Sequence, residues 1–148
     1  MFRGITQLSL DVKGRIAIPA KYRGELVEQC SGRLVVTADP SRCLLIYPQP
    51  AWEPIEQKLS ALPSFNSKTR KLQRLLIGSA SDVEMDNAGR ILIAPPLRSF
   101  ASLSKEVVLV GQGEKFELWD EQQWNLEIED ALSFNEDDMP QELEGFSL

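Results

Sequence analysis

The sequence predicts a β-rich α+β fold built from two similar halves. The first observation is a motif that occurs twice, because DVKGRIAIPAKYR at residues 11–23 returns as DNAGRILIAPPLR at residues 86–98. The second is that each copy is followed by two apolar segments with a turn between them, a pattern typical of β-strands. The third is a stretch of helical periodicity between the copies.

Each copy of the motif is expected to form a β-hairpin. Leu8 and Leu10 alternate with polar residues before the first turn, and the same alternation continues after it with Ile16 and Ile18. A period of two places one face of each strand on a core. A unit of about 45 residues buries little surface alone, so the two copies are expected to share one β-rich core.

The turn itself has a conserved layout in the two copies. Asp11 is expected to accept hydrogen bonds from backbone amides of the turn, and Gly14 is expected to adopt a positive φ. Asp86 and Gly89 stand 75 residues later and are expected to do the same. These four residues are therefore predicted to be structural turn residues.

The segment between the copies predicts two helices. Residues 53–62 carry apolar side chains at helical spacing, and a second helix is expected from the N-capping residue Asn66 to Gly78. The second helix is basic and carries four cations, Lys68, Arg70, Lys71 and Arg74. They are expected to form a solvated helix face, and the less favoured alternative is a contact with nucleic acid.

A last helix is expected over residues 121–134, with Trp124, Ile128 and Leu132 on one face. The acidic tail after it is expected to be loosely ordered. The predicted division of the chain is a first repeat, a helical bridge, a second repeat, and a C-terminal helix with its tail: residues 5–52, 53–80, 81–124 and 125–148.

Composition argues against an enzyme. The chain has no histidine, which excludes Ser-His-Asp and Cys-His nucleophile systems and the usual catalytic zinc sets. Its two cysteines, Cys30 and Cys43, are expected to be buried reduced thiols. We therefore expect no catalytic residues, metal, cofactor or small-molecule substrate. No apolar run is long enough to span a bilayer and the N-terminus lacks signal-peptide features, so we expect a cytoplasmic protein with no membrane partner.

Charge is distributed unequally along the chain. The net charge is −6, but residues 1–80 contain 12 Lys or Arg and 6 acids, whereas residues 81–148 contain 4 and 16. A partner meets the local field rather than the average. The basic half is therefore compatible with nucleic acid, and the acidic half is compatible with a basic partner.

These features resemble the MraZ family of bacterial transcriptional regulators, which is related to the AbrB and MazE swapped-hairpin DNA-binding domains. The residues that carry the resemblance are the opening MFRG, the paired DVKGR and DNAGR motifs, QRLLIGSA in the bridge, and KFELWD. The resemblance implies a double-split β-barrel made of two pseudo-symmetric AbrB-like halves with short connecting helices. It also implies a nucleoid-associated homo-oligomer, arranged as a ring. Such a ring binds double-stranded DNA at direct repeats upstream of its own division and cell-wall operon as a repressor.

The family's D-x-x-x-R signature maps onto Asp11 with Arg15 and onto Asp86 with Arg90. An arginine can hold guanine O6 and N7 in the major groove, and a two-stranded ribbon fits that groove. We expect DNA contacts from Arg15 and Lys13 at the first turn, from Arg3 near it, and from Arg90 at the second turn, where the alternatives are nearly balanced. The alternative for Arg15 and for Arg90 is an ion pair with Asp11 or Asp86 that only stabilises the turn.

Two further functions remain open. AbrB-like folds also serve as antitoxins, so the acidic C-terminal half provides an alternative as a protein-interaction module. An enzyme is the third and least favoured possibility, since no catalytic residue can be named.

Overall fold

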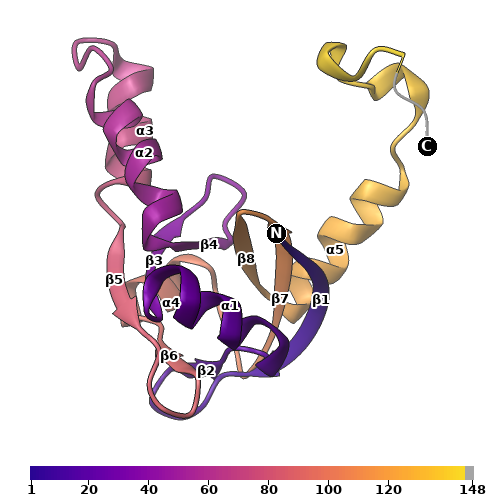
Figure 1. Ribbon diagram of the computed structural model, residues 1–148. Coiled ribbons are helices and arrows are strands. Elements are labelled where there is room, and N and C mark those ends of the chain that lie inside the picture. Colours follow the sequence, from indigo (N-terminus) through magenta and orange to yellow (C-terminus); the bar gives the residue numbers. More distant parts are fainter. Residues whose placement is uncertain (146–148) are drawn as a thin grey trace.

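Eight β-strands pair into two antiparallel sheets in the computed structural model, which describes residues 1–145 (Figure 1). The strands are β1 (Phe2–Ser9), β2 (Arg15–Ala17), β3 (Arg33–Ala38), β4 (Leu44–Pro48), β5 (Ser81–Glu84), β6 (Arg90–Leu92), β7 (Glu106–Gly113) and β8 (Lys115–Asp120). Six of them form a sheet in the order β1-β7-β8-β4-β3-β5, while β2 and β6 form a separate two-stranded ribbon. The prediction of a β-rich α+β fold is confirmed.

Helices connect the strands and cover the sheet. They are α1 (Ala20–Cys30), α2 (Gln49–Ser60), α3 (Ser67–Leu76), α4 (Pro95–Phe100) and α5 (Glu121–Leu132), followed by the 3-10 turns η1 (Glu136–Asp138) and η2 (Gln141–Leu143). The bridge helices and the last helix were predicted, and Asn66 caps α3 by accepting from the Lys68 amide at 2.9 Å. Helices α1 and α4 were missed, because each buries too few side chains to leave a clear helical period. Leu132, expected on one helix face with Trp124 and Ile128, is 75% exposed.

The prediction of two local hairpins is wrong. β1 does not pair with β2 but runs antiparallel to β7 of the second half, and β5 pairs with β3 of the first half. β2 likewise pairs with β6 of the other half. The sheet is therefore pseudo-symmetric: exchanging each strand of the first half with its counterpart in the second half, β1 with β5, β3 with β7 and β4 with β8, gives the same strand order read from the other end. The alternating pattern was read correctly, but a pattern identifies a strand's buried face and not its neighbour.

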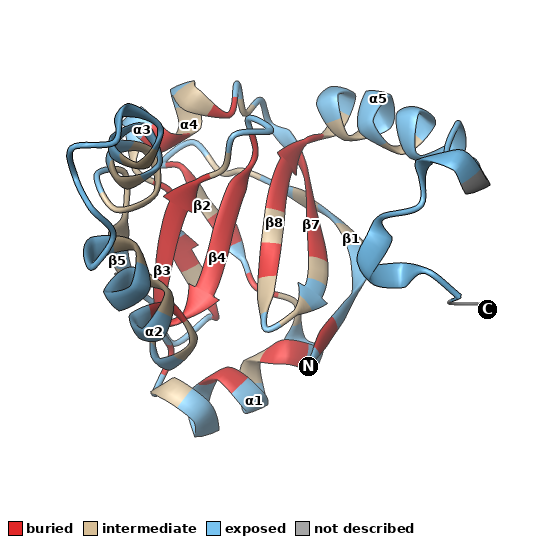
Figure 2. Cartoon of the chain, turned by 90° about the horizontal axis from the view of Figure 1, so that it is seen from above, coloured by how far each residue is buried: buried red, intermediate tan, exposed pale blue. Residues whose placement is uncertain are grey.

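One core joins the two halves, as predicted. Ile16 and Ile18 of the first motif and Ile91 and Ile93 of the second are at most 1% exposed and lie in the same cluster. Figure 2 shows that the buried residues concentrate in the four central strands. The outermost strands, β1 and β5, are not joined to each other. Within residues 1–145 the six-stranded sheet is therefore open and does not close into a barrel.

The outer face of the sheet carries two smaller apolar clusters. In the first half α2 packs with α3 over a cluster that includes Tyr47 and Trp52, and Leu76 of α3 packs against it. In the second half α5 covers β7 and β8, with the Trp119 and Trp124 ring centroids 6.0 Å apart.

Both cysteines are free thiols. Cys43 is fully buried, and burial raises the pKa of its thiol. Cys30 is only half-buried, and its Sγ donates to the Leu26 carbonyl at 3.1 Å. The expectation of a buried thiol is thus confirmed for Cys43 and only partly met for Cys30.

Candidate nucleic-acid interface

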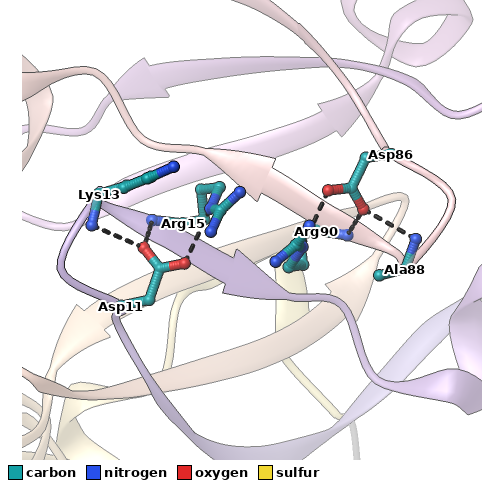
Figure 3. Close-up of polar contacts among 6 residues, drawn as sticks. All are labelled: Asp11, Lys13, Arg15, Asp86, Ala88 and Arg90. Carbon is teal, nitrogen blue, oxygen red and sulfur yellow. Dashed lines mark hydrogen bonds and ion pairs between the residues drawn. The ribbon is translucent and has the colours of Figure 1, made fainter.

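The two motif turns meet at the ribbon formed by β2 and β6 (Figure 3). Ile16 pairs with Ile91, and both side chains enter the core at 1% exposure. Alternation along each strand therefore turns Arg15 and Arg90 to the opposite, outward face. Arg15 pairs with Leu92 and Arg90 pairs with Ala17, so the two arginines are diagonal neighbours roughly 7–8 Å apart.

Asp11 organises the first turn through three hydrogen bonds. Its Oδ1 accepts from the backbone amides of Lys13 at 2.9 Å and Arg15 at 2.8 Å, and Oδ2 accepts from Arg15 Nε at 2.8 Å. Gly14 has a φ of 86°, as expected for the turn. The backbone amide of Arg15 is the largest cause that lowers the pKa of Asp11, and its side chain adds to the effect.

The second turn repeats this geometry almost atom for atom. Asp86 accepts from the amides of Ala88 at 2.9 Å and Arg90 at 2.8 Å, and from Arg90 Nε at 2.9 Å. The Arg90 amide is likewise the largest cause that lowers the pKa of Asp86. Gly89 has a φ of 75°. The four residues predicted to shape the turns therefore do so.

The ion pairs leave most of each guanidinium free. Within residues 1–145, each of these arginines bonds a carboxylate through Nε alone, and the side chains of Arg15 and Arg90 are 28% and 40% exposed. An arginine carries five N–H donors, so the Nη groups remain available on the outward face. The ion pair that was the alternative to a DNA contact is thus present in both turns. It orients the guanidinium and leaves the Nη donors for another partner.

The two turns are also locked to each other. The Ile18 amide donates to the Gly89 carbonyl and the Ile93 amide to the Gly14 carbonyl, both at 2.8 Å. Arg98 lies against the opposite turn, because a Cβ at Gly14 would stand 2.7 Å from Arg98 Cζ. The positive φ therefore favours glycine in this turn, and a Cβ would in addition displace the Arg98 guanidinium.

Arg23 occupies the equivalent place against Gly89, and its Nε donates to the Ile18 carbonyl at 2.6 Å. The Nε atom of its counterpart, Arg98, is buried and has no partner among the described residues. Sequence reasoning saw both arginines as part of the repeat but gave them no role. Arg23 and Arg98 stand at the same number of residues after Gly14 and Gly89, and this equal spacing was the signal that could have indicated a shared role.

Not every predicted contact joins this face. Lys13 is exposed at the tip of the first turn, beside the fully exposed Val12, which sequence reasoning had passed over. Arg3 lies near the start of β1, roughly 20 Å of extended chain before Ser9, so it is not near the turn as had been expected. Helix α3 lies at the opposite end of the molecule from the ribbon (Figure 1). The assignment of DNA contacts to particular residues stays a prediction.

No helix within residues 1–145 is both long and apolar enough to cross a membrane. The same residues contain no group of three or more Cys, Asp or Glu side chains placed to hold a metal ion.

Comparison with known proteins identifies the relatives of this chain. A family model described as "MraZ protein, putative antitoxin-like" matches residues 1–75 and, a second time, residues 76–143. The chain belongs to the MraZ family. This confirms the resemblance seen in the sequence and accounts for the paired architecture.

Individual MraZ proteins match along their whole length. A protein named transcriptional regulator MraZ from Nitrosomonas europaea is 70% identical over 148 residues, covering all of both chains. Its namesake from Nitrosospira multiformis is 69% identical with the same coverage. One from Coxiella burnetii is 54% identical, again over all of both chains. These names support a transcription regulator and confirm the expectation that the protein is not an enzyme.

Proposed function

We propose that this chain is a sequence-specific DNA-binding regulator that represses transcription from direct repeats upstream of its own division and cell-wall operon. The observation that supports the proposal is the convergence of both D-x-x-G-R turns on one ribbon with Arg15 and Arg90 side by side on its outward face. A two-stranded ribbon fits the major groove, and the free Nη groups match the acceptors of guanine. The operator and the sign of regulation follow from the family resemblance.

The roles within the ribbon differ in this proposal. Arg15 reads a base edge and the exposed Lys13 binds a phosphate, because cations at the rim position a protein on the duplex. Val12 and Leu92, 101% and 51% exposed, offer apolar surface for a thymine methyl group. Arg90 contributes less, since Ala88 replaces the lysine of the first turn.

The proposed division of the chain follows these roles. Residues 5–52 and 81–124 are two AbrB-like repeats that present the turns, with the bridge 53–80 between them and 125–148 as C-terminal helix and tail. We interpret the open sheet and the ribbon as the parts of a double-split barrel. The protein works in the cytoplasm, associated with the nucleoid, as a homo-oligomeric ring.

Association strengthens binding for a physical reason. One chain of net charge −6 neutralises few phosphates, and phosphate neutralisation supplies much of the affinity for DNA. A ring that presents several ribbons to several repeats converts later contacts into intramolecular ones, which multiplies modest affinities.

A gel shift with the DNA upstream of the chain's own gene tests the proposal. Affinity should rise with each added repeat and fall steeply with salt, because counterions return to the phosphates. Loss of the shift on scrambled repeats checks specificity. Binding that ignores both the number of repeats and their sequence would contradict the proposal.

A protein-interaction module remains the second candidate. The observation that favours it is the acidic helix α5, which has four carboxylates and no Lys or Arg. A stable complex with a basic protein, together with no shift of upstream DNA, would establish this candidate in place of the first.

A further inference from the structure

The two halves differ in how the outer face of the sheet is covered. Helix α2 has α3 beside it, and Gln73 Nε2 of α3 donates to the Leu59 carbonyl of α2 at 2.8 Å. Helix α5 is the counterpart of α2 in the second half, but no second helix among residues 1–145 packs beside it. Its outward side chains Leu126 and Leu132 are 66% and 75% exposed. One helix face in the second half is therefore unpartnered.

The sequence of α5 shows what this face would accept. Trp52 of α2 and Trp124 of α5 are equivalent, which sets an offset of 72 residues. Ile55 of α2 packs against the cluster that also holds Leu76 of α3, and its equivalent in α5 is Glu127. Three residues further along, Lys58 of α2 is replaced by Asp130. These two acids favour a partner that carries cations.

A groove runs along this side of α5. It has a volume of about 280 Å³, and both apolar and acidic side chains line it. Its lining residues include Trp119, Trp124, Ile128, Ala131, Glu127 and Asp130. Glu127 and Asp130 form no ion pair within the described chain, and the third acid of the groove, Glu117, accepts a hydrogen bond from Trp119 Nε1 at 2.9 Å.

Helix α3 supplies the complementary surface. It contains four cations and no acid, and all four are exposed: Lys68, Arg70, Lys71 and Arg74. None of them is in an ion pair with a described residue. The loop before α3 carries Phe65, whose side chain is 87% exposed. An exposed aromatic beside cations is the composition of an interface anchor.

One chain cannot join its own two surfaces. In Figure 1 the arm made of α2 and α3 and the arm made of α5 leave the sheet on different sides and point away from each other. A contact between them therefore has to form between two copies, in a head-to-tail arrangement that leaves one surface of each kind free to continue the assembly.

We propose that the basic face of α3 in one copy docks on the acidic face of α5 in the next. Lys68 and Lys71 pair with Glu127 and Asp130, and Phe65 enters the groove beside Trp124. The proposal rests on the self-association included in the proposed function, and it assigns the surfaces that join. The occupant of the open face of α5 is thus a second copy of this chain.

Charge reversal with rescue tests the assignment. Lys68→Glu/Lys71→Glu puts acids at the docking positions of both arms, and Glu127→Lys/Asp130→Lys puts lysines at those positions of both arms. Each variant alone should fall to the 16.6 kDa mass of one chain in light scattering at low salt. An equimolar mixture should assemble again, because the two variants can alternate so that every contact again joins two lysines with two acids. Far-UV circular dichroism checks that each variant is folded.

A matched control changes the same charge elsewhere. Glu28→Lys/Glu106→Lys reverses two exposed carboxylates outside both arms and should leave the mass of the wild-type assembly unchanged.

Three results would overturn the inference. A wild-type mass of one chain would remove self-association itself. A wild-type assembly that survives both reversals would place the interface on another surface. If Lys68→Glu/Lys71→Glu still assembles but binds DNA more weakly, α3 contacts DNA and not a second copy. Loss of the gel shift alone in variants of the ribbon would bear on the proposed function and not on this interface.

Discussion

Replacing Arg15 with alanine separates the two interpretations of the motif. The substitution removes the guanidinium and its Nε bond to Asp11, but it leaves the two backbone amides that also bond to Asp11. The neighbouring Ile16 remains in the core. The turn should therefore keep its shape while its outward face loses the donor fork.

The expected magnitudes differ for folding and for binding. The ion pair is partly exposed, at 28% and 36%, and such pairs contribute little to stability, so Tm should fall by less than about 4 °C. A lost base contact costs about 1–3 kcal/mol, or roughly 5- to 150-fold in affinity per site. Losses at separate sites add, so an assembly that engages several repeats should lose operator binding almost completely.

Fluorescence anisotropy with operator DNA and a thermal melt measure the two effects in parallel. Arg90→Ala is the matched control, since it removes an equivalent ion pair at 2.9 Å and should weaken binding less. A large drop in Tm or a change in oligomer mass in the Arg15 variant would show that the residue serves folding. Unchanged affinity in a folded Arg15 variant would refute the base-reading role.

Acid should destabilise the turns. Hydrogen bonds from the backbone lower the pKa of Asp11 and of Asp86. The stability that these carboxylates contribute is therefore present at neutral pH and is lost only as the pH falls below the ordinary carboxyl pKa of 3.8. The protection factors of the turn amides, which correct for the intrinsic pH dependence of hydrogen exchange, should fall in that range and stay constant between pH 5 and 8. Gly14→Ala should destabilise the protein by about 1–3 kcal/mol in urea denaturation, because φ is 86° and Arg98 fills the space, whereas Gly24→Ala on the open side of α1 should stabilise it by up to about 1 kcal/mol. Cys43 should resist alkylation until the protein unfolds, because burial raises its thiol pKa; modification of the native protein at this residue would show that the core opens.

The local structural features of this protein could be predicted from its sequence. The Asp and Gly residues of each turn, the cap of α3 at Asn66 and the α+β class were all readable, because each depends on contacts within a few residues. The family was readable as well, since the motif occurs twice in a fixed order. The uneven charge was also visible, with acids concentrated after residue 80.

The pairing of distant segments could not be predicted in this way. An alternating strand can pair with any strand whose apolar face shares its core, so the pattern before Asp11 did not reveal that β1 joins β7 or that β2 joins β6. The exchange brought Arg15 and Arg90 to one face and took Arg3 away from it. The same long-range packing set α3 and α5 on arms that point apart (Figure 1), because strand pairing fixes the places from which those helices leave the sheet.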